Sequence, residues 1–353
     1  MRRVCTVPPQ TLRLCGEYFF LTVKKDDWTM ILVTNNEGTL GAPTTAQLLA
    51  EGHHALDAIE AGIRLIEADP SVRTVGRGGW PNLLCEMELD ACMMDGTTLR
   101  SGAVGALQGH LHPISVAREI MRRLPHELLV GQGAARFARE IGAEPADNLI
   151  DDSRRAWQAW FDNEVPEEQK RAWPDTPLAQ LCRHAIDPEV GHDTTVFLAQ
   201  DSAGNICTGT STSGWGWKYP GRLGDSPIVG AGSYADTRYG AAACTGAGEM
   251  AIRCCTARSI VLYMKAGASV SDAVHEAAED MRALKGGLIS RVTIHAIDRN
   301  GDHKVVAVNG SRDNKYWIWE GQGKPRLESA EPIAISAVQP RTTTTTRYTT
   351  IPR

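Results

Sequence analysis

The sequence predicts a fold of mixed α and β structure, with strands clustered centrally and helices before and after them. Two observations support this prediction. Apolar residues recur at helical spacing between residues 55 and 68, and again between residues 249 and 284. Between these segments, residues 195–199 and 206–210 have the composition of strands. Such an order suits two layers of sheet covered by helices on both outer faces.

The first half of the chain is predicted to contain three helices and a buried strand. Leu56, Ile59, Ile63 and Ile66 share one face of a helix over residues 55–68, and Asp69-Pro70 ends it. The remaining elements are a strand over residues 89–94, which turns at Asp95-Gly96, and helices over residues 114–123 and 134–140. Residues 144–190 are polar and contain several prolines, so we expect an exposed linker there.

The second half is predicted to begin with a β-hairpin. Its strands flank Asp201-Ser-Ala-Gly-Asn205, a typical turn composition. The later elements are helices over residues 249–266 and 270–284, strands over residues 291–298 and 304–309, and a last strand over residues 316–320.

Composition excludes several classes of function. The net charge of -5 over 353 residues gives no reason to expect nucleic acid or an anionic membrane as a partner. No apolar run approaches the roughly 20 residues of a membrane span. The nine cysteines form no Cys-x-x-Cys pair and are odd in number, which favours buried free thiols over a disulfide framework.

We expect a single domain over residues 30–340. Residues 1–29 are predicted to be an N-terminal extension, either an upstream addition or the product of a misplaced start codon, and residues 341–353 a disordered tail. The segment 15–23 is a poor secretory signal, so we expect a cytoplasmic protein. A secreted or lysosomal location is the alternative, for which Asn309-Gly-Ser311 offers a lone glycosylation acceptor.

The most informative segment is Gly191-His192-Asp193-Thr194-Thr195. A threonine hydroxyl within a chain has no adjacent base, whereas an N-terminal threonine carries an α-amine with a pKa of roughly 7.7–8.0. If the chain is cut before Thr194, one residue supplies both nucleophile and proton acceptor. The alternative is a polar turn before a strand.

Further motifs follow this segment: Gly209-Thr-Ser-Thr212, Gly221-Arg-Leu-Gly-Asp-Ser-Pro-Ile-Val-Gly-Ala-Gly232, Tyr234-Ala-Asp236 and Ala241-Ala-Ala-Cys-Thr-Gly246. With them the sequence resembles the glycosylasparaginase (aspartylglucosaminidase) branch of the N-terminal nucleophile hydrolases, the family that includes plant-type asparaginases and isoaspartyl peptidases. The resemblance covers most of residues 30–320. It implies an α+β fold, a four-layer αββα sandwich, made of an α-chain portion (30–193) and a β-chain portion (194–340). The cleavage site would be Asp193-Thr194, preceded by His192.

The resemblance also implies catalytic roles. Thr194 matches the nucleophile, and Thr212 matches a residue whose hydroxyl orients it. Thr245 and Gly246 match the pair whose hydroxyl and backbone N–H stabilise the oxyanion. The structural alternatives are a strand-edge threonine for Thr194, ordinary strand surface for Thr212 and a helix entry for Thr245-Gly246.

Arg222 and Asp225 match the residues that recognise the substrate. A guanidinium binds a carboxylate through two hydrogen bonds and a carboxylate accepts from an ammonium, so the pair suits a free amino acid. A salt bridge on a glycine-rich loop is the alternative.

The resulting hypothesis is a self-cleaving amidohydrolase that releases aspartate from N4-(β-N-acetylglucosaminyl)-L-asparagine. It needs no cofactor or metal, because His192 has no partner at ligand spacing, and the family suggests a homodimer of αβ units. Glycosylasparaginases carry a tryptophan just after the first strand, where this chain reads Val33-Thr-Asn-Asn-Glu-Gly38. An asparaginase or isoaspartyl dipeptidase therefore remains an alternative, as does an uncleaved, non-catalytic amino-acid-binding protein.

Overall fold

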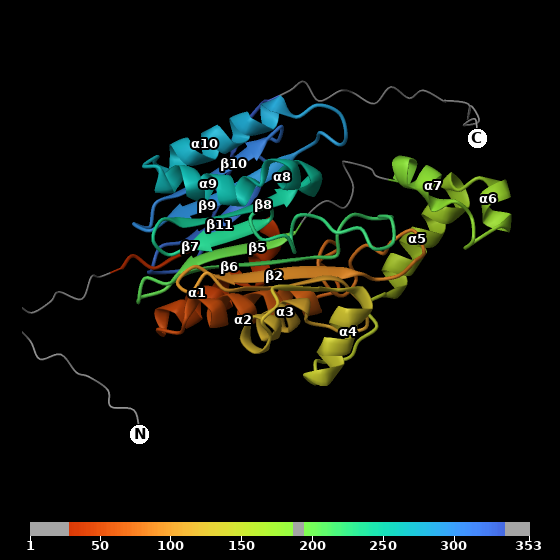
Figure 1. The fold of residues 1–353 in the computed structure, drawn as a ribbon, viewed down its shortest axis with the longest axis horizontal. Helices are drawn as coiled ribbons and strands as arrows, with labels where there is room; N and C mark the ends of the chain where they lie inside the picture. Colours follow the sequence, from red (N-terminus) through yellow and green to blue (C-terminus); the bar gives the residue numbers. More distant parts are fainter. Residues whose placement is uncertain (1–27, 186–193, 336–353) are drawn as a thin grey trace, which may run out of the picture.

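Two β-sheets pack face to face between two layers of helices (Figure 1). The computed structural model describes residues 28–185 and 194–335. The larger sheet has eight strands in the order β12-β11-β1-β5-β6-β2-β3-β4, and the smaller has five in the order β13-β10-β9-β8-β7. This arrangement confirms the predicted α+β fold and its four αββα layers.

The strand bounds are as follows: β1 Ile31–Asn35, β2 Leu89–Asp95, β3 Ser101–Leu107, β4 Leu128–Val130, β5 Thr195–Gln200, β6 Ile206–Thr212, β7 Ser233–Asp236, β8 Gly240–Gly246, β9 Val292–Asp298, β10 His303–Val308, β11 Lys315–Trp319, β12 Arg326–Ser329 and β13 Glu331–Ile333. The helices are α1 Ala42–Ala50, α2 Ala55–Ala68, α3 Pro113–Arg123, α4 Gly131–Glu140, α5 Asp151–Glu164, α6 Glu167–Arg171, α7 Leu178–Ala185, α8 Gly248–Cys254, α9 Thr256–Lys265 and α10 Val270–Asp280, with 3-10 turns η1 Asn36–Leu40 and η2 Met281–Ala283.

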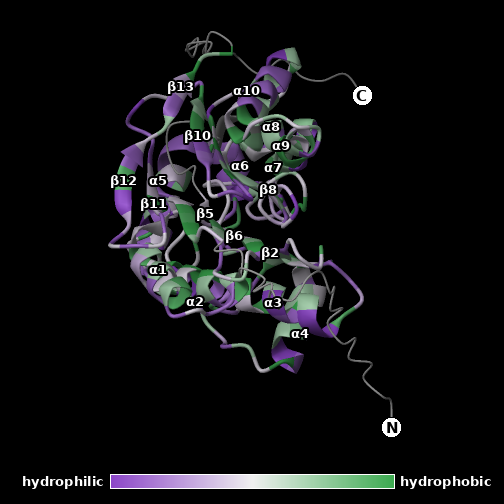
Figure 2. Cartoon of the chain, turned by 90° about the vertical axis from the view of Figure 1, so that its left-hand side faces the viewer, coloured by the Kyte–Doolittle hydropathy of each residue, from purple (hydrophilic) through white to green (hydrophobic). Residues whose placement is uncertain are grey.

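Burial of apolar side chains explains the layers. Alternating residues of a strand point to opposite faces, and here both faces are covered. Leu32 and Phe197 pack against α1 and α2, whereas their neighbours Val33 and Val196 face the second sheet. A third core lies between the smaller sheet and α8 to α10. In Figure 2 the inner strands are mostly green, whereas the edge strand β12 is mostly purple.

The elements with a clear apolar period were predicted well. Helix α2 begins at Ala55 and ends at Ala68, as expected, and β2, α3 and α4 lie within a few residues of their predicted bounds. The hairpin of β5 and β6 is also confirmed, since Thr195 pairs with Ser211 and Gln200 with Ile206. In the described residues, no helix has the length and apolarity needed to cross a membrane.

The linker predicted for residues 144–190 is wrong over residues 151–185, which contain helices, although many of these residues are exposed, as expected; residues 186–190 lie outside the described part of the chain. Residues 151–185 form α5, α6 and α7, which lie beside one end of the sheets (Figure 1). Trp157 stacks on Phe161 with ring centroids 5.0 Å apart, and Trp160 stacks on Trp217, in the loop after β6, at 5.5 Å. These aromatic contacts supply the apolar core that the polar, proline-containing composition obscured.

Three smaller predictions also need correction. Strand β11 is not the last, because β12 and β13 follow it. The helix predicted over residues 249–266 is two helices, since Cys255 has a left-handed backbone (φ 48°) between α8 and α9. The seven cysteines in the described residues are free, as expected, but only Cys92, Cys207 and Cys244 are buried.

Candidate active site

Thr194 lies immediately before β5, the central strand of the larger sheet. It is 5 % exposed, and its hydroxyl Oγ1 lies 3.3 Å from Oγ of Ser226. Ser226 is held in turn by β6, because Thr210 Oγ1 donates to its carbonyl oxygen at 2.8 Å. The loop that carries Arg222 and Asp225 is therefore attached directly beside the predicted nucleophile.

Asn35, at the end of β1, holds the backbone on both sides of Thr195. Its Nδ2 donates to the carbonyl oxygen of Thr194 at 2.5 Å, and its Oδ1 accepts from the N–H of Val196 at 3.1 Å. Sequence reasoning did not assign Asn35 to the site. The sequence feature that could have indicated Asn35 is its position in the segment of residues 33–38, where the family carries a tryptophan and this chain does not.

Thr212 ends β6 opposite the start of β5. Its hydroxyl accepts from the N–H of Gly214 at 2.9 Å and donates to the carbonyl oxygen of Thr74 at 3.3 Å. Gly214 has a φ of 72°, and a Cβ there would lie 3.1 Å from Nζ of Lys218. A side chain at this corner would be strained and crowded, which explains the glycine.

Thr245 and Gly246 are the last two residues of β8, and α8 begins two residues later. Gly246 has a φ of 105°, and a Cβ there would lie 2.5 Å from the carbonyl oxygen of Arg291. Only glycine fits this position without displacing Arg291, the residue before β9, so the direction of its N–H is set by the fold. The role of the pair as oxyanion donors stays a prediction.

Arg222 pairs with Glu249 rather than with Asp225. Its Nε and Nη2 donate to Oε1 of Glu249 at 3.1 and 2.8 Å, and Nη2 also reaches Oε2 at 3.0 Å. The guanidinium lies over the ring of Trp215, 4.5 Å from its centroid. The alternative, a salt bridge within the glycine-rich loop, is therefore not what Arg222 forms; its ion pair is with the first turn of α8. Sequence reasoning did not assign Glu249 to the site, although it stands three positions after Gly246.

Asp225 is 4 % exposed, and its Oδ2 has no hydrogen-bond partner among the described residues. Burial raises the pKa of this carboxyl to about 7, against the opposing effect of the nearby Arg222. An acceptor that is buried without a partner is costly unless a ligand supplies a donor. Such a group is suited to receive an ammonium.

One small pocket brings these groups together. Its lining residues are the residue before β5, the ends of β6 and β8, and part of the loop after β6: Thr194, Thr212, Gly214, Trp215, Arg222, Gly224, Asp225, Ser226 and Gly246. Five of the predicted site residues, Thr194, Thr212, Arg222, Asp225 and Gly246, thus line one pocket, and Thr245 is the residue before Gly246 at the end of β8. His192 and Asp193 lie outside the described residues.

A separate group of potential metal ligands lies at the other end of these strands. Ligand atoms of His54, Asp95 and Cys207 are all within 4.8 Å of one another. However, Nδ1 of His54 already accepts from Leu56 N–H, and both oxygens of Asp95 accept from the turn after β2. Local hydrogen bonding accounts for these side chains.

The comparisons with known proteins decide the family. The family model described as "Asparaginase" matches residues 39–319. The chain belongs to the asparaginase family. It is therefore a hydrolase of this type, as predicted.

Named relatives fall into two groups. The N(4)-(Beta-N-acetylglucosaminyl)-L-asparaginase of Elizabethkingia miricola is 36 % identical over 250 residues, 71 % of this chain and 68 % of the relative. The enzyme of the same name from Rattus norvegicus is 38 % identical over 232 residues, 62 % of this chain and 67 % of the relative. The Plant-type L-asparaginase of Pyrococcus abyssi is 37 % identical over 271 residues, 77 % of this chain and 85 % of the relative.

Proposed function

We propose that this asparaginase-family hydrolase cuts itself between Asp193 and Thr194 and then releases aspartate from N4-(β-N-acetylglucosaminyl)-L-asparagine. The observation that carries the proposal is the single pocket shared by Thr194, Arg222 and Asp225. A hydroxyl nucleophile there adjoins a cation and a carboxyl that match the two charged groups of an amino acid.

Self-cleavage begins with attack of the Thr194 hydroxyl on the carbonyl carbon of Asp193. The C–N bond breaks, the nitrogen takes up the hydroxyl proton, and an ester joins the two residues. Water then hydrolyses the ester, leaving a carboxylate on Asp193 and a free amine on Thr194. Asn35 supports this step, because it fixes the carbonyl oxygen of Thr194 and the N–H of Val196 while the preceding bond is exchanged.

In turnover, the new amine accepts the proton of the Thr194 hydroxyl as the oxygen attacks the side-chain amide carbon of the substrate. The same proton passes to the leaving nitrogen, and an aspartyl ester remains. Water hydrolyses this ester to aspartate. Thr245 Oγ1 and Gly246 N–H are proposed to stabilise the oxyanion of both tetrahedral intermediates.

Recognition of the substrate's α-amine is assigned to Asp225, whose unpartnered Oδ2 accepts from the ammonium. The α-carboxylate is assigned to Arg222. Since Nε and Nη2 of Arg222 contact Glu249, the substrate either takes Nη1 or displaces Glu249 from the fork.

A second candidate is L-asparaginase or isoaspartyl dipeptidase activity. Two observations favour it: the segment of residues 33–38, at and just after the end of β1, contains no tryptophan, and the Pyrococcus abyssi relative covers more of this chain than the two glycosylasparaginases. Both candidates use the same nucleophile and recognition pair, so they differ only in the leaving group.

A denaturing gel with intact-mass analysis tests the nucleophile. We expect two fragments, one beginning at Thr194, and we expect Thr194→Ala to remain a single inactive chain. Thr195→Val is the matched control, because Thr195 is fully buried and its Oγ1 has no partner among the described residues. The control should cleave and turn over within about threefold of the wild type, since no hydrogen bond is lost.

Aspartate release from glucosaminyl-asparagine, asparagine and β-aspartyl dipeptides, measured side by side, decides the substrate. The largest kcat/KM is expected for glucosaminyl-asparagine, and a preference for either other substrate would select the second candidate. A single uncleaved chain in fully active material would refute the threonine mechanism. An uncleaved chain that binds amino acids without turnover would indicate a binding protein.

A further inference from the structure

Glu67 is a fully buried carboxylate that the proposed reaction does not use. It lies in the last turn of α2 with a side-chain exposure of 0 %. Its Oε1 accepts from Ser211 Oγ at 2.7 Å and from Ile114 N–H at 3.0 Å. Burial raises the pKa of Glu67, while the bonds from His112 and Ser211 act in the opposite direction. A carboxylate is costly to bury, so these bonds must hold it in one place.

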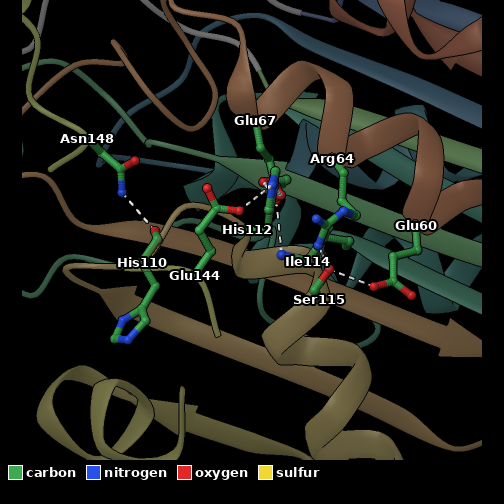
Figure 3. Close-up of polar contacts among 10 residues, drawn as sticks. Glu60, Arg64, Glu67, His110, His112, Ile114, Ser115, Glu144 and Asn148 are labelled. Carbon is green, nitrogen blue, oxygen red and sulfur yellow. Dashed lines mark hydrogen bonds and ion pairs between the residues drawn. The ribbon is translucent and has the colours of Figure 1, made fainter. Parts of the chain in front are cut away.

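A second carboxylate connects this group to the surface. Figure 3 shows His112 between Glu67 and Glu144. Its Nδ1 lies 3.4 Å from Oε2 of Glu67, and its Nε2 lies 3.8 Å from Oε2 of Glu144, which is 60 % exposed. Ile114 is at the N-terminus of α3, where a negative charge is favourable. Glu67 is thereby fixed by α3 on one side.

On its other side Glu67 fixes the end of β6. Ser211 pairs with Thr195 of β5 and with Ala91 of β2, so it belongs to the centre of the sheet. Side chains alternate along a strand, and Ser211 therefore faces α2 while Thr212 faces the pocket. Glu67 holds Ser211, and the orientation of the next residue, Thr212, relative to Thr194 depends on the position of Ser211.

The loop that follows Glu67 contacts the same corner. A hydrogen bond of 2.8 Å from Arg77 N–H to the carbonyl oxygen of Glu67 closes the first half of this loop. Within it, the carbonyl oxygen of Thr74 accepts from Thr212 Oγ1 at 3.3 Å and from Ser213 N–H at 2.9 Å. The Glu67 side chain thus contacts Ser211, and the loop contacts Thr212, the next residue of β6.

We propose that Glu67 is a positioning residue for the reaction, acting through Ser211 to hold Thr212 in register with Thr194. The inference rests on the proposed function. Neither Glu67 nor Ser211 lines the pocket, so neither contacts the substrate. Loss of the contact should therefore lower kcat and slow self-cleavage without changing substrate affinity.

The test is Ser211→Ala, which removes the hydroxyl and leaves the bond from Ile114 to Glu67. We expect kcat and the rate of precursor cleavage to fall about tenfold, as for loss of one buried hydrogen bond to a charged group, with KM within about twofold. Glu67→Gln should keep kcat within about threefold, because its amide oxygen still accepts from Ser211, whereas Glu67→Ala should match Ser211→Ala.

Ser115→Ala is the matched control in the same cluster (Figure 3). Ser115 Oγ donates to Glu60 at 2.6 Å and accepts from Arg64 at 2.8 Å, so it joins α2 to α3 without touching β6. Its kcat should equal that of the wild type, with a fall in Tm similar to that of Ser211→Ala.

Three results would overturn the inference while leaving the proposed function intact: an unchanged kcat for Ser211→Ala, an equal loss for Ser115→Ala, or a rise in KM that accounts for the loss. A wild-type chain that neither cleaves nor releases aspartate would overturn the proposed function, and this inference with it.

Discussion

Replacing Arg222 by lysine tests the recognition of the substrate carboxylate. Arg222 has a side-chain exposure of 16 %, and its guanidinium is fixed by Glu249 on its edge and by Trp215 on its face. Lysine keeps the positive charge but has neither the planar fork nor the stacking surface. The variant therefore separates geometry from charge.

The magnitude follows from the contacts that lysine loses. A hydrogen bond to a charged group contributes about 1.5–3 kcal/mol, and a factor of ten in affinity corresponds to about 1.4 kcal/mol. If the substrate carboxylate loses one such bond, KM should rise roughly 10- to 150-fold. The change in kcat should be small, because Arg222 is assigned to the α-carboxylate and Thr194 to the reacting carbon.

The assay is aspartate release over a range of substrate concentrations, repeated with an analogue that lacks the α-carboxylate. We expect the wild type and Arg222→Lys to bind the analogue equally weakly. Arg258→Lys is the control, since Arg258 also lies over an aromatic ring, Tyr234 at 4.9 Å, but does not line the pocket. An unchanged KM for Arg222→Lys, or an equal effect on the analogue, would remove Arg222 from the carboxylate site.

Further predictions concern Asn35, Gly246 and Asp225. Asn35→Ala loses both bonds that flank Thr195, so precursor cleavage followed on gels should slow about tenfold, and an unchanged half-time would contradict the role. Gly246→Ala forces a Cβ to within 2.5 Å of a carbonyl oxygen and turns the N–H away, so kcat should fall about 10²- to 10³-fold with KM little changed. Asp225 has a pKa raised to about 7, so KM should fall as pH rises through 7 and the carboxyl ionises; a flat KM profile would exclude it as the amine acceptor. In the absence of substrate, the folded protein binds more protons than the unfolded protein between pH about 4 and 7. The free energy of unfolding, measured in denaturant, should therefore decrease as pH rises through that window. Asp225→Asn should lack this decrease.

The spacing of apolar residues along the chain was sufficient to predict those helices and strands in which this spacing is regular. Leu56, Ile59, Ile63 and Ile66 fixed α2 at its observed ends, because one face of that helix is buried against the sheet. The local pattern failed for α5 to α7, where burial depends on a few aromatic rings rather than on a row of apolar side chains along one helix face. Trp160 is covered by Trp217, 57 positions later in the sequence, so its environment could not be deduced from neighbouring residues.

The candidate site likewise contains residues that the sequence predicted and residues that it did not. Motifs located Thr194, Thr212, Gly246, Arg222 and Asp225, which the structure gathers into one pocket. The residues that hold them were missed, because their contacts join distant parts of the chain. Asn35 reaches Thr194 across 159 positions, and Glu67 reaches Ser211 across 144.

Arg222 and Asp225 each already have a substitute for the charge that the proposed ligand would bring. Glu249 gives Arg222 a carboxylate, and burial raises the pKa of the Asp225 carboxyl to about 7, so that below this pH a proton on Asp225 takes the place of an ammonium. A zwitterionic amino acid replaces both at once. Its ammonium stabilises the ionised form of Asp225 and so releases a proton, while its carboxylate competes with Glu249 for the guanidinium. A ligand with only one of the two charges would replace just one of these two substitutes, so on the proposed assignment we expect the pair to select free α-amino acids with a derivatised side chain over peptides or simple amides.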